Sequence, residues 1–202
     1  MSFSRTLLLA VLLAAPAAAQ DRTATLPDGT LLRADDAARL NDLDAATGQA
    51  LRQALAEAAP ADLATLTKAM QGQPLPPQEA LTALQGEWTC QTIKVGGGLP
   101  LVVYPPFRCQ AGPDGSFDKV TGSQRTTGQT TIFSGLPLYV GTAYVQGSTP
   151  LRYADFGEAP PPDPGVTAPD VGVIEMTGPD SGRILFPRPY VESVLNVLVL
   201  TR

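Results

Sequence analysis

The chain has 202 residues, of which 14 are basic and 19 acidic, so its formal net charge is −5 at neutral pH. It contains no histidine and only two cysteines. The acidic balance disfavours nucleic acid, because neutralising phosphates requires a basic face. The lack of histidine excludes Ser-His-Asp and Cys-His catalytic groups and imidazole metal sites, and two cysteines are too few for a thiolate zinc site. We therefore expect no nucleic-acid partner, no metal, no cofactor and no enzymatic activity.

The first nineteen residues have the pattern of an export signal. Arg5 supplies the positive charge, and residues 7–15 form an apolar stretch that is shorter than the roughly 20 residues needed to span a bilayer. Residues 17–19 are all alanine, which fits a cleavage site. We expect residues 1–19 to be a signal peptide cleaved after Ala19. The protein is then periplasmic or secreted, with no membrane span in the mature chain.

Residues 34–72 have a helical pattern, in which apolar and small side chains recur every three or four positions. Pro60 fits the first turn of a second helix, and Gly72 ends it. A linker over 73–77 follows. Two short amphipathic helices cannot bury their own apolar faces, so we expect them to dock on the rest of the chain or on a partner protein. We assign 20–77 to this helical segment and its linker.

From Leu84 onward the apolar period changes to two, and turn residues recur at roughly 8 to 12 positions, which is typical of an all-β barrel or sandwich. The 20 prolines and 19 glycines fit many turns. The predicted strands cover 86–95, 101–110, 115–123, 126–133, 136–145, 171–177, 182–187 and 194–201. Short strands of this number suit an antiparallel barrel that holds one small ligand. We therefore predict an α+β fold, with an N-terminal helical hairpin before an eight-stranded antiparallel β-barrel domain over 78–202.

Cys90 and Cys109 predict one disulfide bond in an oxidising compartment. Direct cross-strand pairing of the two cysteines places the hairpin turn slightly later than the glycines at 96–98 do. Either a bulge at Pro105 and Pro106 absorbs the offset, since proline cannot donate to a ladder, or the bridge is diagonal. The pair lacks the C-x-x-C spacing of a redox site.

Gly86 and Trp88 on the first predicted strand resemble the Gly-x-Trp signature of lipocalins and other calycins, in which the tryptophan closes one end of a barrel. The predicted barrel is in this respect calycin-like. A longer similarity covers residues 84–202: the segments 86–94, 103–109, 119–125 and 187–193 resemble a family of secreted bacterial proteins known as domain of unknown function 4893. That resemblance implies an exported protein with no assigned activity, so no catalytic residue is carried over.

Strand alternation places Trp88 and Lys94 on one face of the first strand, and Lys119, Ser123 and Arg125 on one face of the third. A buried charge must be paired or serve a ligand, and we expect Glu192 to pair with Arg125 or Lys94. Our candidate residues for binding a small polar or anionic ligand are Lys94, Lys119, Ser123, Arg125 and Glu192. The alternative is that these residues face water, or form a salt-bridge network that closes the barrel.

Three functions remain open from the sequence. The first is a non-enzymatic barrel that binds a small ligand, and the sequence favours it. The second is a protein-interaction or protease-inhibitor-like module of the cell envelope, using the helices or the proline-rich loop over 146–170. The third, a hydrolase based on carboxylates or a lone serine, ranks last because histidine is absent.

Overall fold

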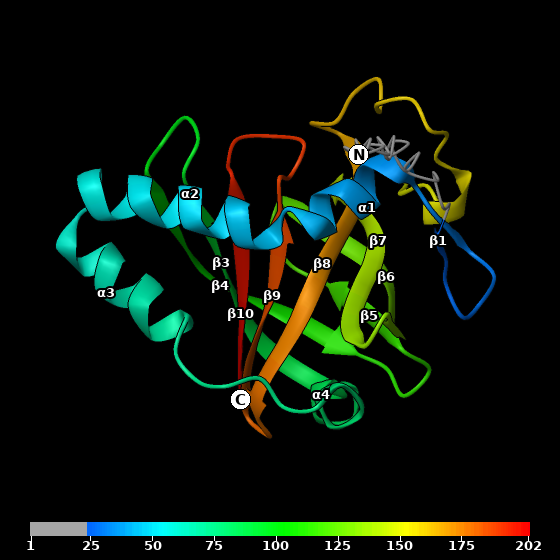
Figure 1. Ribbon diagram of the computed structural model, residues 1–202, viewed down its shortest axis with the longest axis horizontal. Helices are drawn as coiled ribbons and strands as arrows, with labels where there is room; N and C mark the ends of the chain where they lie inside the picture. Colours follow the sequence, from blue (N-terminus) through cyan, green and yellow to red (C-terminus); the bar gives the residue numbers. More distant parts are fainter. Residues whose placement is uncertain (1–23) are drawn as a thin grey trace, which may run out of the picture.

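The computed structural model describes residues 24–202 (Figure 1). The expected signal peptide, with its cleavage site after Ala19, lies outside the described residues. Within them, no helix combines the length and apolar character that crossing a membrane requires. A two-stranded hairpin, β1 (Ala24–Thr25) and β2 (Leu31–Leu32), precedes the helices. The helices are α1 (Ala34–Asn41), α2 (Leu43–Glu57), α3 (Pro60–Ala69) and α4 (Pro77–Leu84).

The rest of the chain forms a closed barrel in which every neighbouring pair of strands is antiparallel. The strands are β3 (Gly86–Val95), β4 (Leu101–Ala111), β5 (Ser116–Lys119), β6 (Gln124–Phe133), β7 (Leu136–Val145), β8 (Thr167–Gly178), β9 (Ser181–Pro187) and β10 (Leu195–Thr201). Strands adjacent in the sequence are adjacent in the sheet, and β10 closes the barrel against β3. The predicted α+β fold with an eight-stranded antiparallel barrel is confirmed, and it is consistent with a calycin-like architecture.

Two predicted strands are wrong in their extent: the strand predicted over 171–177 begins four residues earlier, at Thr167, and the third barrel strand is shorter than predicted. The third barrel strand ends at Lys119 instead of continuing to residue 123, and β6 begins at Gln124. Gly122 has a φ of +91°, a left-handed conformation that glycine adopts readily and that turns the chain here. Arg125 therefore lies on β6, and the prediction that it shares one strand face with Lys119 and Ser123 is corrected.

The predicted disulfide is present, with 5.8 Å between the Cα atoms of Cys90 and Cys109. Cys109 lies opposite Trp88 in the ladder, and Cys90 lies opposite Phe107, so the bridge is diagonal. The register also shifts between Gln91 and Ile93, beside the two prolines of β4. The sequence left open whether a bulge at the prolines or a diagonal bridge absorbs the offset between the cysteines and the turn, and the structure has both.

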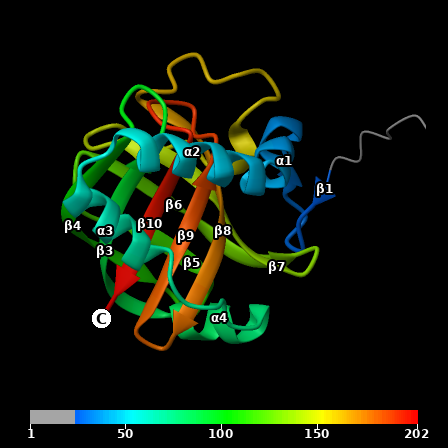
Figure 2. The same ribbon diagram turned by 60° about the vertical axis from the view of Figure 1, so that its left-hand side comes forward.

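Helix α2 crosses the outside of the barrel over β3, β9 and β10, and α3 lies against β4 (Figure 2). Ala46, Ala50 and Ala54 form the buried face of α2, and their small side chains let the helix lie close to the sheet. They pack in one cluster with residues of the sheet's outer face such as Ile93 and Leu195. The expected docking of the helices on the rest of the chain is thus observed.

Helix α4, which the sequence analysis did not identify, closes one end of the barrel (Figure 1). It begins at Pro77, next to the predicted domain boundary, and buries Ala80 and Leu84 against the barrel interior. The indole of Trp88 is buried at the same end, where its Nε1 donates a 2.6 Å hydrogen bond to the carbonyl of Leu84. The guanidinium of Arg202 lies 3.8 Å from the centre of the indole ring. Trp88 therefore has the barrel-closing position that the Gly-x-Trp signature implies.

Candidate ligand site at the polar end of the barrel

The barrel contains a cavity of about 110 Å³ at the end opposite α4. The β9–β10 loop, residues 188–194, lies over this end in Figure 1 and contributes three residues to the cavity wall. The cavity exists because inward side chains at this level are small: Ala143 of β7 lies directly opposite Ala168 of β8. The other end is filled by large side chains such as Phe117 and Tyr139, whose rings meet edge to face with their centres 5.6 Å apart. The cavity therefore offers space for a small ligand at the polar end of the barrel.

Lys94 enters the cavity wall from β3 and is almost completely buried. Its Nζ donates a 2.8 Å hydrogen bond to Oε1 of Gln124 and forms an ion pair with the carboxylate of Glu192. The expected partnership of Glu192 with Lys94 is thus present. Burial lowers the pKa of Lys94, because the charged ammonium loses hydrating water.

Lys119 enters the same cavity from β5. Its Nζ donates to the backbone carbonyls of Gln124 at 2.6 Å and Thr121 at 3.2 Å, and it lies 3.8 Å from the centre of the Phe107 ring. Burial, followed by repulsion from Arg125 and Lys94, lowers the pKa of Lys119 to about 8. Within residues 24–202, Lys119 has no carboxylate at ion-pair distance.

Arg125 is the third cation of this cluster and lies half-buried in the cavity wall. Its Nε donates a 3.0 Å hydrogen bond to the carbonyl of Gly122, and no acid of the described chain pairs with it. Ser123 is exposed and does not line the cavity. Of the five candidate residues, the structure brings together the three cations and Glu192, and it leaves Ser123 outside.

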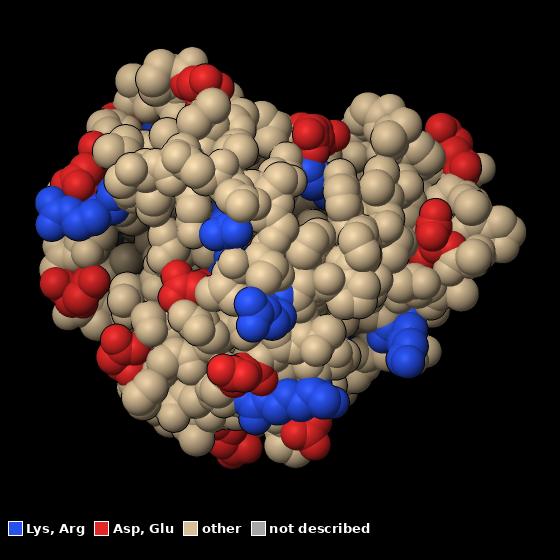
Figure 3. Space-filling model, turned by 180° about the vertical axis from the view of Figure 1, so that it is seen from behind, with Lys and Arg blue, Asp and Glu red and all other residues tan. Residues whose placement is uncertain are grey.

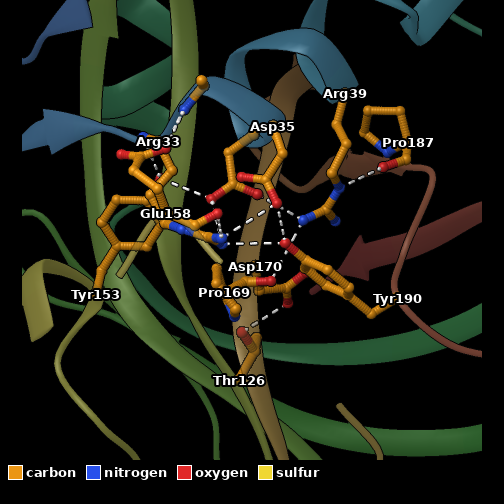
Figure 4. A network of polar contacts seen from close by, with 12 residues as sticks. Arg33, Asp35, Arg39, Thr126, Tyr153, Glu158, Pro169, Asp170, Pro187 and Tyr190 are labelled. Carbon is orange, nitrogen blue, oxygen red and sulfur yellow. Dashed lines mark hydrogen bonds and ion pairs between the residues drawn. The ribbon is translucent and has the colours of Figure 1, made fainter. Parts of the chain in front are cut away.

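A second polar group closes the same end of the barrel from the side of α1 (Figure 4). Its centre is Asp36, which is fully buried and accepts hydrogen bonds from Arg39 at 2.8 Å and from the hydroxyl of Tyr153 at 2.7 Å. Tyr153 belongs to the short 3-10 helix η1 (Tyr153–Asp155). Arg33 completes the group, donating to Asp36 and to the hydroxyl of Tyr190. Burial raises the pKa of Asp36 above its usual range, against the opposing effect of Arg39.

This polar group continues into the cavity wall through Arg39, Asp170 and Tyr190. Arg39 donates to the carbonyl of Pro187 at 3.2 Å, and its buried Nη2 has no hydrogen-bond partner among the described residues. Asp170 accepts a 2.9 Å hydrogen bond from the hydroxyl of Thr126, and burial raises the pKa of Asp170 to about 6. The cavity therefore has cations on one wall and an easily protonated carboxyl group on another.

The helices, the barrel strands and the residues that line the cavity fall within the region matched by one protein family. A family described as "Domain of unknown function (DUF4893)" matches residues 30–200. The chain belongs to the DUF4893 family. The comparisons with curated proteins and with solved structures gave no match. The match extends from β2 to β10, so the DUF4893 domain includes the cation cluster, Asp36 and the β9–β10 loop.

The charged residues of α1 in the DUF4893 domain were not found by sequence reasoning. Asp36 and Arg39 lie three positions apart on α1, and Arg33 lies three positions before Asp36, at the N-cap of that helix. Alternating charges at that spacing were a usable signal, although they are also common on solvated helix faces. Within residues 24–202, the DUF4893 domain has no group of three or more potential metal-ligating side chains.

Proposed function

We propose that this DUF4893 protein is a non-enzymatic binding protein that holds a small anion in the polar end of its barrel. The observation that carries the proposal is an imbalance of charge. Lys94, Lys119 and Arg125 gather at one cavity, and Glu192 is the one carboxylate of the described chain that pairs with any of them. An anion in the cavity would compensate the remaining positive charge.

The cost of this arrangement without a ligand supports the proposal. Burying an ammonium group is unfavourable unless it is paired, and the lowered pKa of Lys119 expresses that cost. The backbone carbonyls that Lys119 contacts orient its Nζ but do not neutralise its charge. A negatively charged ligand would gain the full benefit of donors that are already in position.

The same contacts also hold the turn between β5 and β6, and this structural role is the main alternative. A turn needs donors for its carbonyl groups, and Lys119 and Arg125 supply them. A turn does not, however, need a third cation from β3 or an open cavity beside it. On the face shown in Figure 3, by contrast, positive and negative side chains are interspersed. The cation cluster in the barrel is therefore unlike that surface.

We infer that this binding takes place outside the cytoplasm. The disulfide between Cys90 and Cys109 supports a periplasmic or extracellular location, because cytosolic thiols are kept reduced. The export pattern at the start of the sequence supports the same location. Analysis of the mature N-terminus of protein purified from its host tests this inference, which predicts a chain that begins at Gln20.

Calorimetric titration with acetate and with phosphate, at constant ionic strength, tests the proposed function. We expect K119M to lose about tenfold or more in affinity, the effect of removing a charged hydrogen-bond donor. K68M is the matched control, because Lys68 is exposed on α3 and should bind like the wild-type protein. If neither anion binds the wild-type protein, or if K119M and K68M bind equally well, the proposal is wrong.

A further inference from the structure

The cavity has an apolar wall as well as a cationic one. Val145 and Ala143 of β7, Ala168 of β8, and Phe186 and Leu198 of β9 and β10 all line it. These apolar residues come from β7, β8, β9 and β10, whereas Lys94, Lys119 and Arg125 come from β3, β5 and β6. A ligand that fills the cavity therefore contacts positive charge and hydrocarbon at the same time.

An inorganic anion does not match such a wall. Phosphate and sulfate carry oxygen in every direction, and each oxygen that faces hydrocarbon loses a hydrogen bond to water without replacement. Most of the small-molecule sites in proteins have the composition seen here, with an apolar lining and a few polar groups that fix the orientation. The lining thus selects a ligand with one charged end and one apolar end.

We propose that the ligand is a small organic acid, with its carboxylate at Lys94 and Lys119 and its apolar part against β7, β8 and β10. This inference rests on the proposed anion-binding function and specifies the class of anion. The ion pair with Glu192 shows that the position of the Lys94 ammonium allows it to pair with a carboxylate. The Glu192 side chain is 52% exposed, so a ligand carboxylate can replace it at Lys94 without unpacking the barrel.

The cavity also limits the size of the acid. Its volume of about 110 Å³ is small. At roughly 10–15 Å³ for each water-sized group, it accommodates an acid of about eight non-hydrogen atoms, the size of hexanoate. The lining contains small residues at Ala143 and Ala168, which are side-by-side neighbours on adjacent strands and leave room for the apolar part.

A titration series of acetate, butyrate, hexanoate and decanoate tests the ligand class, with phosphate and hexanol as controls. Each added methylene should raise the affinity by about fourfold up to hexanoate, since it removes apolar surface from water. Decanoate should gain nothing further, because the cavity is full. Hexanol should bind at least about tenfold more weakly than hexanoate, because it carries no charge.

Two variants, A168V and A143V, narrow the apolar part of the cavity and so test where the hydrocarbon part of the ligand lies. Both should weaken hexanoate binding by about tenfold or more, and should weaken it more than acetate binding, because the longer acid contacts more of that wall. Two variants are used so that a folding defect in one does not decide the result. Equal affinities for acetate, hexanoate and phosphate would overturn the ligand class while leaving the anion-binding function intact. Failure of every anion to bind would overturn both.

Discussion

The ammonium group of Lys94 is paired with the carboxylate of Glu192, a residue whose backbone φ is +73°. A positive φ is uncommon for a residue with a side chain and needs support from its surroundings. Here the carbonyl of Glu192 accepts a hydrogen bond from the backbone N–H of Gly98, in the turn between β3 and β4. The β9–β10 loop therefore holds an acid at the opening of a cavity rich in cations. In the proposed function, this acid competes with the ligand for Lys94.

The first prediction concerns that competition. Replacing Glu192 with glutamine removes the internal negative charge but keeps the size of the side chain. The E192Q variant should bind acetate about two- to fivefold more tightly than the wild-type protein, the range expected for removing one partly exposed ion pair. E87Q is the control, because Glu87 is exposed on β3 at the other end of the barrel. Weaker binding by E192Q would show that Glu192 assists the ligand instead of competing with it.

The second prediction is a dependence of anion binding on pH. Because the pKa of Lys119 is lowered to about 8, its ammonium loses its proton in the free protein as the pH rises through that value. Affinity for acetate should then fall between about pH 7 and about pH 10, approaching tenfold for each pH unit. The K119R variant should decline far less, because a guanidinium stays charged over this range. An affinity of the wild-type protein that stays constant to about pH 10 would contradict the assignment of Lys119.

Much of the barrel could be predicted because its strands carry a local signal. Strands such as β3 and β7 alternate in polarity and are bounded by glycine turns, so the predicted ranges 86–95 and 136–145 agree with the structure. The end of β5 could not be predicted in this way, because the alternating pattern continues beyond Lys119. The strand ends where the Lys119 ammonium bonds the carbonyls of the following turn, a contact that no local pattern encodes.

The candidate site was predictable for the same reason, and only in part. Lys94 lies on the same strand face as Trp88, and Lys119 on the same face as Phe117, so the alternation of the strands predicted that both lysines point inward. The group around Asp36 could not be predicted, because Asp36 and Tyr153 are separated by 117 positions and their contact depends on the packing of α1. Helix α4 has only eight residues, too few to show a helical period. The alternative role as a protein-interaction module stays a prediction.

The third prediction concerns Asp170. Its pKa in the folded protein, about 6, lies above that of an ordinary aspartate, so the folded state holds a proton that the unfolded state has released between about pH 4 and about pH 6. The free energy of unfolding therefore falls as the pH rises through this window, and the loss is complete above it. The D170N variant cannot ionise and should be more stable than the wild-type protein at about pH 8, by on the order of 1–3 kcal/mol.

Urea unfolding at about pH 4 and about pH 8 measures this effect. The difference between D170N and the wild-type protein should nearly vanish at the lower pH. D163N is the matched control, because Asp163 is exposed, and it should leave both values unchanged. If D170N is instead less stable at the higher pH, the ionised carboxylate is stabilised by Arg39 and the account of Asp170 is wrong.

The fourth prediction separates the two ends of the barrel. Leu84 is 1% exposed and packs beside Trp88 at the end closed by α4. The L84A variant should lose about 2–5 kcal/mol of stability, because it creates a cavity in a packed core. Its affinity for acetate should stay within about twofold of the wild-type value, because the polar end is separate. L81A, at a partly buried position of the same helix, should cost less. A folded L84A protein that no longer binds would contradict the division of the barrel into two ends.

The fifth prediction concerns the disulfide. The bond between Cys90 and Cys109 spans 19 positions and joins β3 to β4. The double variant C90A/C109A should be less stable by about 3 kcal/mol, because the unfolded chain regains the freedom that the crosslink removes. Reduction of the disulfide in the wild-type protein should likewise lower its thermal unfolding midpoint. A change below about 0.5 kcal/mol would show that the barrel does not depend on the crosslink.

The most direct test of anion binding at the cation cluster is a titration of the Lys119 side chain by NMR, with its Nζ signal assigned by comparison with K119R. The account predicts a pKa of about 8 in the free protein, and a clear upward shift when hexanoate or acetate is added, because the bound carboxylate stabilises the ammonium. A Lys119 that titrates like an exposed lysine, or whose pKa does not respond to any anion, would contradict it.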